Sequence, residues 1–319
     1  MQSVEMSRVP GEVIQALARR APLRWLASAL CDWLVIALAI GLFLTTMERL
    51  SWPWSLASGL VAVLVVGVWR HRLSLLGHDG AHYLITRNRV LNHCLSDVLV
   101  FWPNLLRTRN YENFHRPHHR GLGTEIDLEL AHKRLNPANW QLPLPPGALR
   151  RRLLLSSVGG NWRESLLIMR MIGPKSWRDL LGPLLWWGTA LLLIGSTLGI
   201  VAVLWILLIW NVATFTSFIT VFHLRMLCEH HGTVGTHRLK ASWLQRLTVF
   251  PYGEDCHLEH HRYPSVPFHQ LARLREICLA QEQGAGQPLL TMREVLQGLE
   301  RTPPIAAGTA LAETRLSTP

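Results

Sequence analysis

The stretch PLLWWGTALLLIGSTLGIVAVLWILLIWNVATFTSFITVFHLRM, residues 183–226, decides the fold class. Its only charged side chain is Arg225, close to its end. A helix crosses a bilayer with about 20 apolar residues, so this stretch is about twice as long as one crossing needs. The weak break at Gly195–Gly199 divides it into two parts. The sequence therefore predicts a hairpin of two membrane-spanning helices here.

Two earlier apolar runs predict a second hairpin of the same kind. Residues 25–47 form the first expected span, whose only charge is Asp32, and residues 54–69 return. The returning helix can continue through Arg70 to Leu76, beyond the hydrocarbon. Hydrophobic residues make up 49% of the chain and charged residues only 17%, against a usual charged share of about 25%. We therefore expect an all-α membrane protein with four transmembrane helices in two hairpins.

The rest of the chain is polar or amphipathic and divides around these runs. Residues 1–24 are mixed and basic, and they predict an N-terminal cytoplasmic arm that is either loose or an interfacial helix. Residues 25–275 are expected to form the membrane domain, with a helical cap on its cytoplasmic side. Residues 276–319 predict a C-terminal cytoplasmic helix followed by a disordered tail, because Thr302–Pro319 is rich in Pro, Ala and Thr.

The Lys and Arg residues are distributed according to this predicted topology. They do not form the basic stripe that would indicate nucleic-acid binding. Of the 32 Lys and Arg residues, four lie in residues 1–24, 17 in residues 70–182 and ten after residue 224. Only Arg49 lies in a loop on the other side. Because Lys and Arg accumulate in cytoplasmic loops, both termini and the long central stretch are expected to be cytoplasmic. The chain is thus predicted to be an integral, multi-pass membrane protein.

Histidines are concentrated in tight groups on that same predicted face. The chain has 16 histidines, and eight of them form three groups with helical spacing. These are a first box of His78 and His82, a second box of His115, His118 and His119, and a third box of His257, His260 and His261. Residues three or four apart share a helix face, so the spacing predicts that each box directs its imidazoles to one point. So many imidazoles exceed the needs of one ion and suit two metal ions.

Three other functions use overlapping residues. The two E-x-x-H segments, which begin at Glu112 and Glu254, could belong to a soluble di-iron bundle, but that site needs further glutamates and leaves half of the histidines without a role. A membrane zinc hydrolase remains an alternative, although the H-E-x-x-H motif is absent. A third interpretation is a membrane metal carrier or scaffold that keeps the histidine clusters without catalysis. A transporter would place polar ligands within its spans, where this chain has little besides Asp32.

The order and placement of the boxes resemble the membrane fatty acid desaturase superfamily, which includes hydroxylases and ketolases. That family carries boxes of the forms HX3-4H, HX2-3HH and (H/Q)X2-3HH. Residues 30–275 carry the likeness, in the segments GHDGAH, NFHRPHHRGLGTEIDLEL, CEHHGT and HLEHHRYPSVP. The resemblance implies a di-iron centre whose ligands are mostly histidines, with no catalytic residue beyond these ligands.

The resemblance also implies one further histidine ligand between the second hairpin and the third box. His230 in Glu229-His230-His231-Gly232 is our choice, with His231 and His223 as alternatives. Gly232 fits a helix that ends just beyond His230. Glu125 and Asp127 are candidates for carboxylates that orient ligand imidazoles. The predicted metal ligands are therefore His78, His82, His115, His118, His119, His230, His257, His260 and His261.

The implied reaction uses two iron ions and O2 to introduce a double bond into a lipid acyl chain. Placement of the chain against the metals decides between this outcome and hydroxylation or ketone formation, so those remain alternatives. Phospholipid, acyl-CoA, acyl carrier protein thioester and sphingoid base are all possible substrates, and a carotenoid is a further one.

Electrons for this reaction are expected to come from a separate protein. The chain has no Gly-rich nucleotide motif, no His-Pro-Gly-Gly segment and no four-cysteine set for an iron–sulfur cluster. Its five cysteines have no C-x-x-C spacing and are expected to be reduced thiols. A ferredoxin or small cytochrome with its reductase is therefore implied, and the basic cytoplasmic surface would attract such an acidic carrier.

The topology can be tested with reporter fusions at residues 50, 130 and 319. We expect only the fusion at residue 50 to report the far side of the membrane, because positive charge keeps the other two positions in the cytoplasm. Activity of compartment-specific reporters measures this. A fusion at residue 130 that reports the far side would contradict the predicted orientation.

Overall fold

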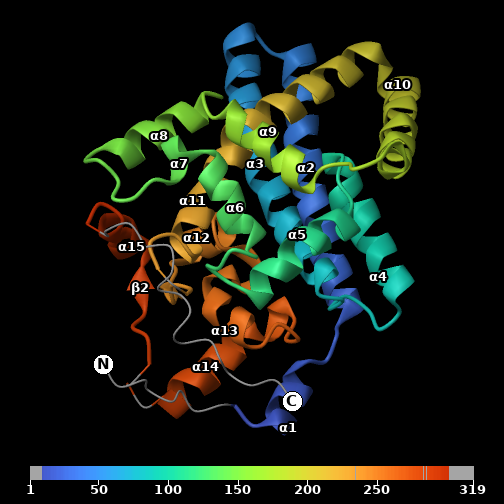
Figure 1. Ribbon diagram of the computed structural model, residues 1–319. Helices are drawn as coiled ribbons and strands as arrows, with labels where there is room; N and C mark the ends of the chain where they lie inside the picture. The colour runs from blue at the N-terminus through green and yellow to red at the C-terminus, as the bar shows by residue number, and fades with distance from the viewer. Residues whose placement is uncertain (1–8, 234, 283, 285, 302–319) are drawn as a thin grey trace. The chain divides into compact units, whose positions relative to one another are not determined.

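The protein is described by a computed structural model that covers residues 9–233, 235–282, 284 and 286–301. These residues are mostly helical, in agreement with the predicted fold class (Figure 1). One small departure from an all-α chain is a parallel pair of two-residue strands, β1 (Leu239–Lys240) and β2 (Leu290–Thr291). The predicted disordered tail, Thr302–Pro319, lies outside the described residues.

The chain forms two compact units, each assembled from separate stretches of sequence. The first unit takes in Met1–Arg20, Glu112–Leu149 and Arg225–Pro319, as far as these are described. The second unit takes in Ala21–Tyr111 and Arg150–Leu224. Three helices contain a boundary between the units: α5 (Thr108–Arg120), α8 (Ala148–Ser157) and α11 (Ile219–Glu229).

The second unit contains the long apolar helices. Its elements are α2 (Pro22–Arg49), α3 (Trp52–Ala81), α4 (Arg89–Ser96), the π-helical turn η1 (Asp97–Phe101), the 3₁₀ turn η2 (Trp102–Asn104), α9 (Trp162–Ile172), α10 (Trp177–Ala213) and the π-helical turn η3 (Thr214–Phe218). Prolines at the starts of α2 and α3 fit helix N-termini, where no backbone N–H is needed.

The first unit is built from short helices. They are α1 (Gly11–Leu17), α6 (Leu128–Leu135), α7 (Pro137–Trp140), α12 (Trp243–Thr248), the 3₁₀ turn η4 (Pro251–Cys256), α13 (His257–Arg262), the 3₁₀ turn η5 (Phe268–Gln270), α14 (Leu271–Glu282) and α15 (Met292–Gly298). Val9 and Leu17, at either end of the α1 segment, belong to a buried apolar cluster with Leu271 and Leu274 of α14. The basic N-terminal segment thus includes a packed helix. The expected domain boundary at residue 275 falls inside α14.

Among the described residues, three helical stretches are long and apolar enough to cross a membrane. They are Pro22–Arg49, Trp52–Ala81 and Trp177–Glu229. On α2 the leucines Leu34 and Leu38 are 58% and 63% exposed, which suits a surface that contacts lipid. These helices make the chain an integral membrane protein.

The third stretch is interrupted at the predicted place. Gly199 has φ 82° and ψ 167°, which no helix accommodates, and the ribbon of α10 changes direction sharply (Figure 1). Glycine adopts this positive φ without the strain that a Cβ would bring. The break divides α10 into two helical parts, as the sequence indicated. That each part crosses the membrane, giving four spans, stays a prediction.

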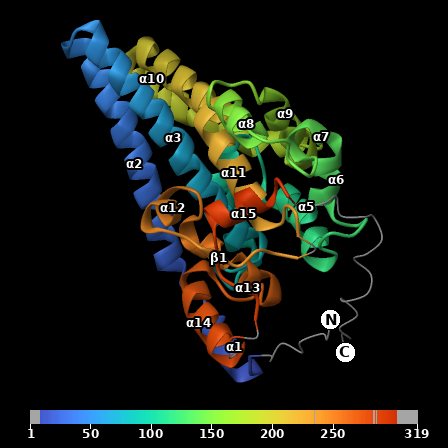
Figure 2. The ribbon, with the colours of Figure 1, turned by 90° about the vertical axis from the view of Figure 1, so that its left-hand side faces the viewer.

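The first hairpin is fixed by polar contacts as well as by apolar packing. α2 and α3 run side by side in opposite directions (Figure 2). Near the start of α2 and the end of α3, the indole of Trp25 donates to the Leu76 carbonyl at 3.0 Å. The carboxylate of Asp32 accepts from Arg72 at 2.9 Å. Asp32, the only charge of the first expected span, is thereby neutralised where it is buried.

A second set of contacts joins α3 to η3 within the same unit. Ser217 donates to the carbonyl of Val63 at 2.7 Å, which requires close approach of the two helices. Gly67 permits this approach, because a Cβ at that position would lie 1.9 Å from the Ser217 hydroxyl oxygen and 2.6 Å from the Phe218 backbone nitrogen. One turn further along α3, Arg70 donates to the Trp210 carbonyl at 2.8 Å and lies over the Trp210 ring.

Replacing Gly67 by alanine tests this close approach. We expect Gly67→Ala to lower the stability of the purified protein by about 1–3 kcal/mol, because the methyl group meets backbone that cannot move aside cheaply. Thermal unfolding in detergent measures the change as a lower Tm. Gly41→Ala in α2 is the matched control: no heavy atom lies within 4 Å of its added Cβ, so its Tm should stay the same or rise. Equal Tm values for the two variants would contradict the packing described.

Candidate metal centre

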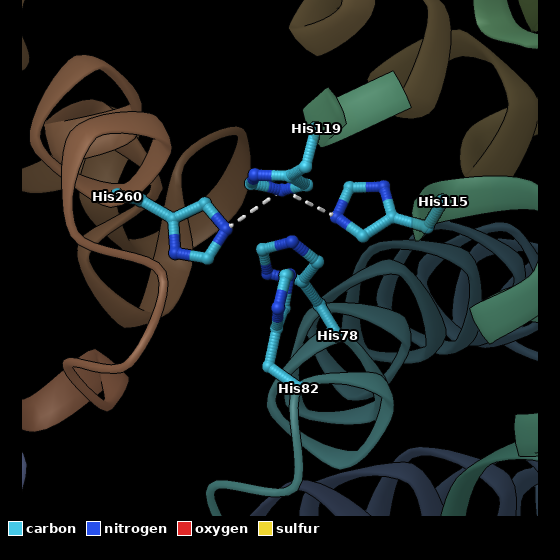
Figure 3. Close-up of side chains that lie close together, drawn as sticks. All are labelled: His78, His82, His115, His119 and His260. Atoms are coloured by element: carbon cyan, nitrogen blue, oxygen red, sulfur yellow. Dashed lines mark hydrogen bonds between the residues drawn. The ribbon is translucent and has the colours of Figure 1, made fainter. Parts of the chain in front are cut away.

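The first box lies at the end of α3 in the second unit. His78 is in the last turn of the helix and His82 is its C-cap residue. Their spacing of four places the two rings together, with centroids 4.8 Å apart and planes nearly perpendicular (Figure 3). The sequence prediction that these two side chains share a face is therefore confirmed.

The second and third boxes lie in the first unit, and each is divided between two groups of rings. His115 and His119 of α5 meet His260 of α13, and we name these three the first histidine group. The second histidine group comprises His118, His230, His257 and His261. For the second and third boxes, the expectation that each box converges on one point is wrong. Neighbouring residues of a helix point about 100° apart, so His118 and His119 face different ways, as do His260 and His261.

In the first histidine group the ring of His119 lies between the other two. Its Nε2 atom is 2.9 Å from Nε2 of His115 and 3.2 Å from Nε2 of His260 (Figure 3). The members come from two helices, α5 and α13, that are far apart in the sequence. Three imidazole nitrogens thus converge within the first unit.

The second histidine group is the more enclosed of the two. Nε2 of His230 is 3.2 Å from Nε2 of His118 and 2.9 Å from Nε2 of His257, and Nε2 of His261 is 3.2 Å from that of His257. One nitrogen of each ring lies within 4.8 Å of one nitrogen of every other. Such a cluster has the ligand spacing of a metal site.

The structure separates the three candidates for the extra histidine. α11 ends at Glu229, Gly232 has φ 76°, and His230 lies in the turn between them, facing the second group. His231 instead lies edge-on to Trp140, and its carbonyl accepts from His237. His223 is 3.4 Å from the side chain of Asn161 in the second unit. The position of His230 agrees with its choice from sequence, and its role as a ligand stays a prediction.

The opposite nitrogens of these rings contact groups that fix the tautomer. Nδ1 of His230 donates to the Gly235 carbonyl at 3.1 Å, and Nδ1 of His118 donates to Asp127 at 2.9 Å. Nδ1 of His257 lies 2.8 Å from Glu254. Oxygen atoms of this kind only accept, so the Nδ1 atoms of His118 and His230 carry protons. The Nε2 atom of each ring therefore faces the group, and a cation bound there would accept a lone pair from it. The residues therefore fit a metal ion.

The pKa shifts of the histidines in the second histidine group also fit a metal ion. Burial lowers the pKa of His230 and of His261 well below the usual range, and neighbouring histidines add to this effect. These rings are therefore neutral, which is the form that binds metal. Burial would also lower the pKa of His257, but the carboxylates of Glu229 and Glu254 outweigh it and raise the pKa. A field that favours a proton on His257 also favours a metal cation there.

A comparison with known proteins identifies the family of this chain. A sequence model of the fatty acid desaturase family, described as "Fatty acid desaturase", matches residues 51–292. The chain belongs to the fatty acid desaturase family. The matched region includes all three boxes and His230, so the resemblance noted from the sequence is confirmed.

A curated relative agrees at lower similarity. It is the dihydrorhizobitoxine desaturase of Bradyrhizobium elkanii, 25% identical over 262 residues, which are 73% of this chain and 70% of that protein. Its name supports an oxidoreductase of the desaturase type. Family membership suggests di-iron chemistry, and the two histidine groups are where this chain could bind metal.

The two candidate carboxylates of the GTEIDLEL segment have different surroundings. Asp127 is buried and contacts the ring of His118, while it also accepts from the backbone N–H of Glu129 and caps α6. Glu125 is exposed and pairs with Arg134. Of the two, Asp127 has the predicted contact with a histidine of the cluster, and Glu125 does not. Asp127 stands at the N-cap, two residues before the backbone N–H from which it accepts, and this position was a sequence signal that could have separated them.

Several residues that support the cluster were not found from the sequence. Glu254 was considered as a metal ligand of a soluble di-iron bundle, but it lies against Nδ1 of His257, the nitrogen away from the group. Glu112 forms an ion pair with Arg116. Glu129, the second acid of Asp-Leu-Glu, is also buried, and Lys133 and His118 hold the pKa of its carboxyl well below its usual range despite burial. The contact between Glu254 and His257 could have been predicted from their i, i+3 spacing, because residues three apart share a helix face.

The third box is held from behind by buried ion pairs. Glu259 lies between the box histidines along α13, and its carboxylate accepts from Arg238 at 2.8 Å and from Arg275 at 3.3 Å. Arg238 also pairs with Glu282. A helix of six residues has little stability of its own, so these contacts fix which way its histidines point.

A pair of adjacent substitutions tests the choice of His230. We expect His230→Ala to weaken metal binding about 10-fold or more, because it removes a nitrogen from the middle of the second histidine group. His231→Ala should bind metal like the wild type, since that ring faces Trp140. Metal per purified chain and the yield in the membrane fraction measure binding and insertion separately. Loss of metal from the His231 variant alone would contradict the assignment.

Proposed function

We propose that this protein is a membrane di-iron desaturase that introduces a double bond into a lipid acyl chain with O2. The observation that carries the proposal is the convergence of imidazole nitrogens in two largely buried groups of the first unit. Membership of the fatty acid desaturase family supports the reaction class and the acyl substrate. The name of the curated relative supports desaturation over hydroxylation.

Nine histidines would hold the metal ions. The first unit supplies seven of them, three in the first histidine group and four in the second. His78 and His82 complete the proposed set, because their spacing and their place in the chain follow the first box of the family. Imidazole is a ligand that iron accepts readily, and family membership makes iron the choice over zinc or copper.

The bound iron pair would supply the oxidising power that removes hydrogen from an unactivated methylene. The residues of this chain orient and shield it. Asp127 and the Gly235 carbonyl hold Nδ1–H groups, so that the Nε2 atoms of His118 and His230 stay directed at one point. Burial of the second histidine group keeps water away from that point. The buried carboxylates of Glu229 and Glu254 offset positive charge beside His257.

Substrate and electrons would reach the site from its surroundings. The spans place the protein in the bilayer, where acyl chains are present. We propose that both termini and the site are cytoplasmic, on the strength of the Lys and Arg distribution. An external ferredoxin or small cytochrome with its reductase would deliver the electrons, and the net charge of +11 would attract an acidic carrier.

Metal analysis and lipid profiling test this function together. We expect the protein purified in detergent to bind two iron ions per chain, and cells that express it to gain unsaturated acyl chains. Mass spectrometry of total lipids under 18O2 measures the product. A variant with His118→Ala and His261→Ala is the matched control, because it should insert while losing both metal and product.

Two results would contradict the proposal in different ways. An 18O-labelled alcohol without a new alkene would show a hydroxylase of the same family. Zinc at one ion per chain, with no iron even after anaerobic loading, would favour a zinc hydrolase.

A further inference from the structure

Helices α8 and α9 bury polar side chains and expose apolar ones. On α8, Leu154 is 58% exposed, and on α9 Trp162 and Leu166 are 53% and 52% exposed. Ser156 of α8 and Glu164 of α9 have no exposed surface. A helix on the surface of a water-soluble domain shows the opposite arrangement, with its apolar side packed against the core. The reversed arrangement indicates that the exposed side of these helices contacts an apolar medium.

Neither helix is a membrane span. α8 has 10 residues and α9 has 11, whereas a crossing takes about 20 apolar residues. Their exposed residues combine charge with apolar surface at intervals of four, so that they share one side: Arg150 and Leu154 on α8, and Trp162, Leu166 and Arg170 on α9. We name this side, with these five residues, the α8–α9 face. Helices that carry Arg beside Trp and Leu lie in the plane of a bilayer surface.

The position of α9 in the chain agrees with a place at the bilayer surface. The third apolar stretch begins with α10 at Trp177, which is itself exposed (Figure 2). Only residues 173–176 separate α9 from α10, and four residues reach at most about 15 Å. The link is also held in place, because the side chain of Asn110 donates to the Gly173 carbonyl at 3.0 Å. α9 therefore ends close to the point at which α10 enters the bilayer.

The positive charge of this segment is not offset by neighbouring acids. Residues 150–179 contain seven Lys and Arg and only two acids, Glu164 and Asp179. Glu164 is buried, and Asp179 accepts from Arg107 at 3.0 Å. Arg150 and Arg170 are exposed, and neither forms an ion pair within the part of the chain that the structure describes. The α8–α9 face therefore suits a partner that is both apolar and negatively charged.

A soluble acidic protein, such as an electron carrier, would match only the charge. Its docking would leave the leucines and Trp162 in water whenever the carrier is away, and contiguous apolar surface in water is unfavourable. An anionic phospholipid supplies both properties together and is always present beside an integral membrane protein. The exposed apolar side chains therefore favour lipid as the occupant.

We propose that the α8–α9 face binds anionic phospholipids at the bilayer surface. Leu154, Trp162 and Leu166 contact the upper part of the acyl chains. Arg150 and Arg170 bind head-group phosphates, because a guanidinium fits two phosphate oxygens at once and its long side chain reaches the head groups. This interaction is separate from the proposed metal centre and does not require it.

The depth of the face is tested with a fluorescent label at Leu166→Cys. The label is placed in a variant that has Cys31→Ser and Cys94→Ser, because these two cysteines are exposed. The full chain is reconstituted in vesicles of phosphatidylcholine and phosphatidylglycerol. We expect nitroxides on the lipid acyl chains to quench this label and aqueous iodide to quench it weakly. Labels at Leu38→Cys on α2 and at Glu125→Cys are the references for lipid and for water.

Head-group binding is tested by titrating the full chain in detergent with phosphatidylglycerol or phosphatidylcholine of the same acyl chains. Native mass spectrometry measures the bound lipid. We expect wild type to bind phosphatidylglycerol at least about 10-fold more tightly, since each Arg near an anionic surface contributes about 5-fold. Arg150→Gln with Arg170→Gln should lose most of this preference. Arg273→Gln with Arg293→Gln removes the same charge from exposed positions of the first unit and should keep it.

Three results would overturn the proposal. If iodide quenches the Leu166 label and lipid nitroxides do not, the face lies in water and a soluble acidic partner becomes the better occupant. If wild type binds both lipids equally, the arginines recognise no head group. If the two double variants lose the preference to the same extent, net charge and not the α8–α9 face causes it. Yield in the membrane fraction checks folding, and Arg170→Gln alone replaces the double variant if that yield falls. None of these measurements uses iron, so their outcome is independent of the proposed di-iron function.

Discussion

The constraint on which the site depends is the crowding of imidazole nitrogens. The Nε2 atom of His230 lies 3.2 Å from that of His118 and 2.9 Å from that of His257, in a place from which water is largely excluded. A cation bound among such nitrogens would offset the repulsion between their lone pairs. The residues behind the rings therefore matter as much as the rings. Asp127, Glu254 and the Gly235 carbonyl contact the Nδ1 atoms, so that the Nε2 atoms face the inner side.

Helix geometry distributes the histidines between two groups. A box of the form H-x-x-H-H places its last two rings about 100° apart on a helix. Helix α5 and helix α13 can therefore each supply histidines to both histidine groups of the first unit. Each ring faces one group only. The doubled histidine at the end of the second and third boxes is the sequence feature that lets two short helices supply two histidine groups.

The sequence predicted the helices and the histidines, and it did not predict how they are combined. The apolar helices could be predicted because the runs are long and nearly free of charge. The break at Gly199 could be predicted because glycine lies within such a run. His230 was selected over His231 on family resemblance, and Gly232 fitted a helix end just beyond it. The division of the second and third boxes, and the different surroundings of Asp127 and Glu125, depend on long-range packing. Spacing along one helix carries no information about which partner helix faces it.

The ion pairs behind the third box have a consequence for biosynthesis. Helix α13 is six residues long, and its orientation depends on Arg238, Arg275 and, through Arg238, on Glu282. A chain emerging from the ribosome lacks Arg275 and Glu282 until those residues have been synthesised. The histidines of the third box therefore take up their final orientation only after that part of the chain has joined the first unit.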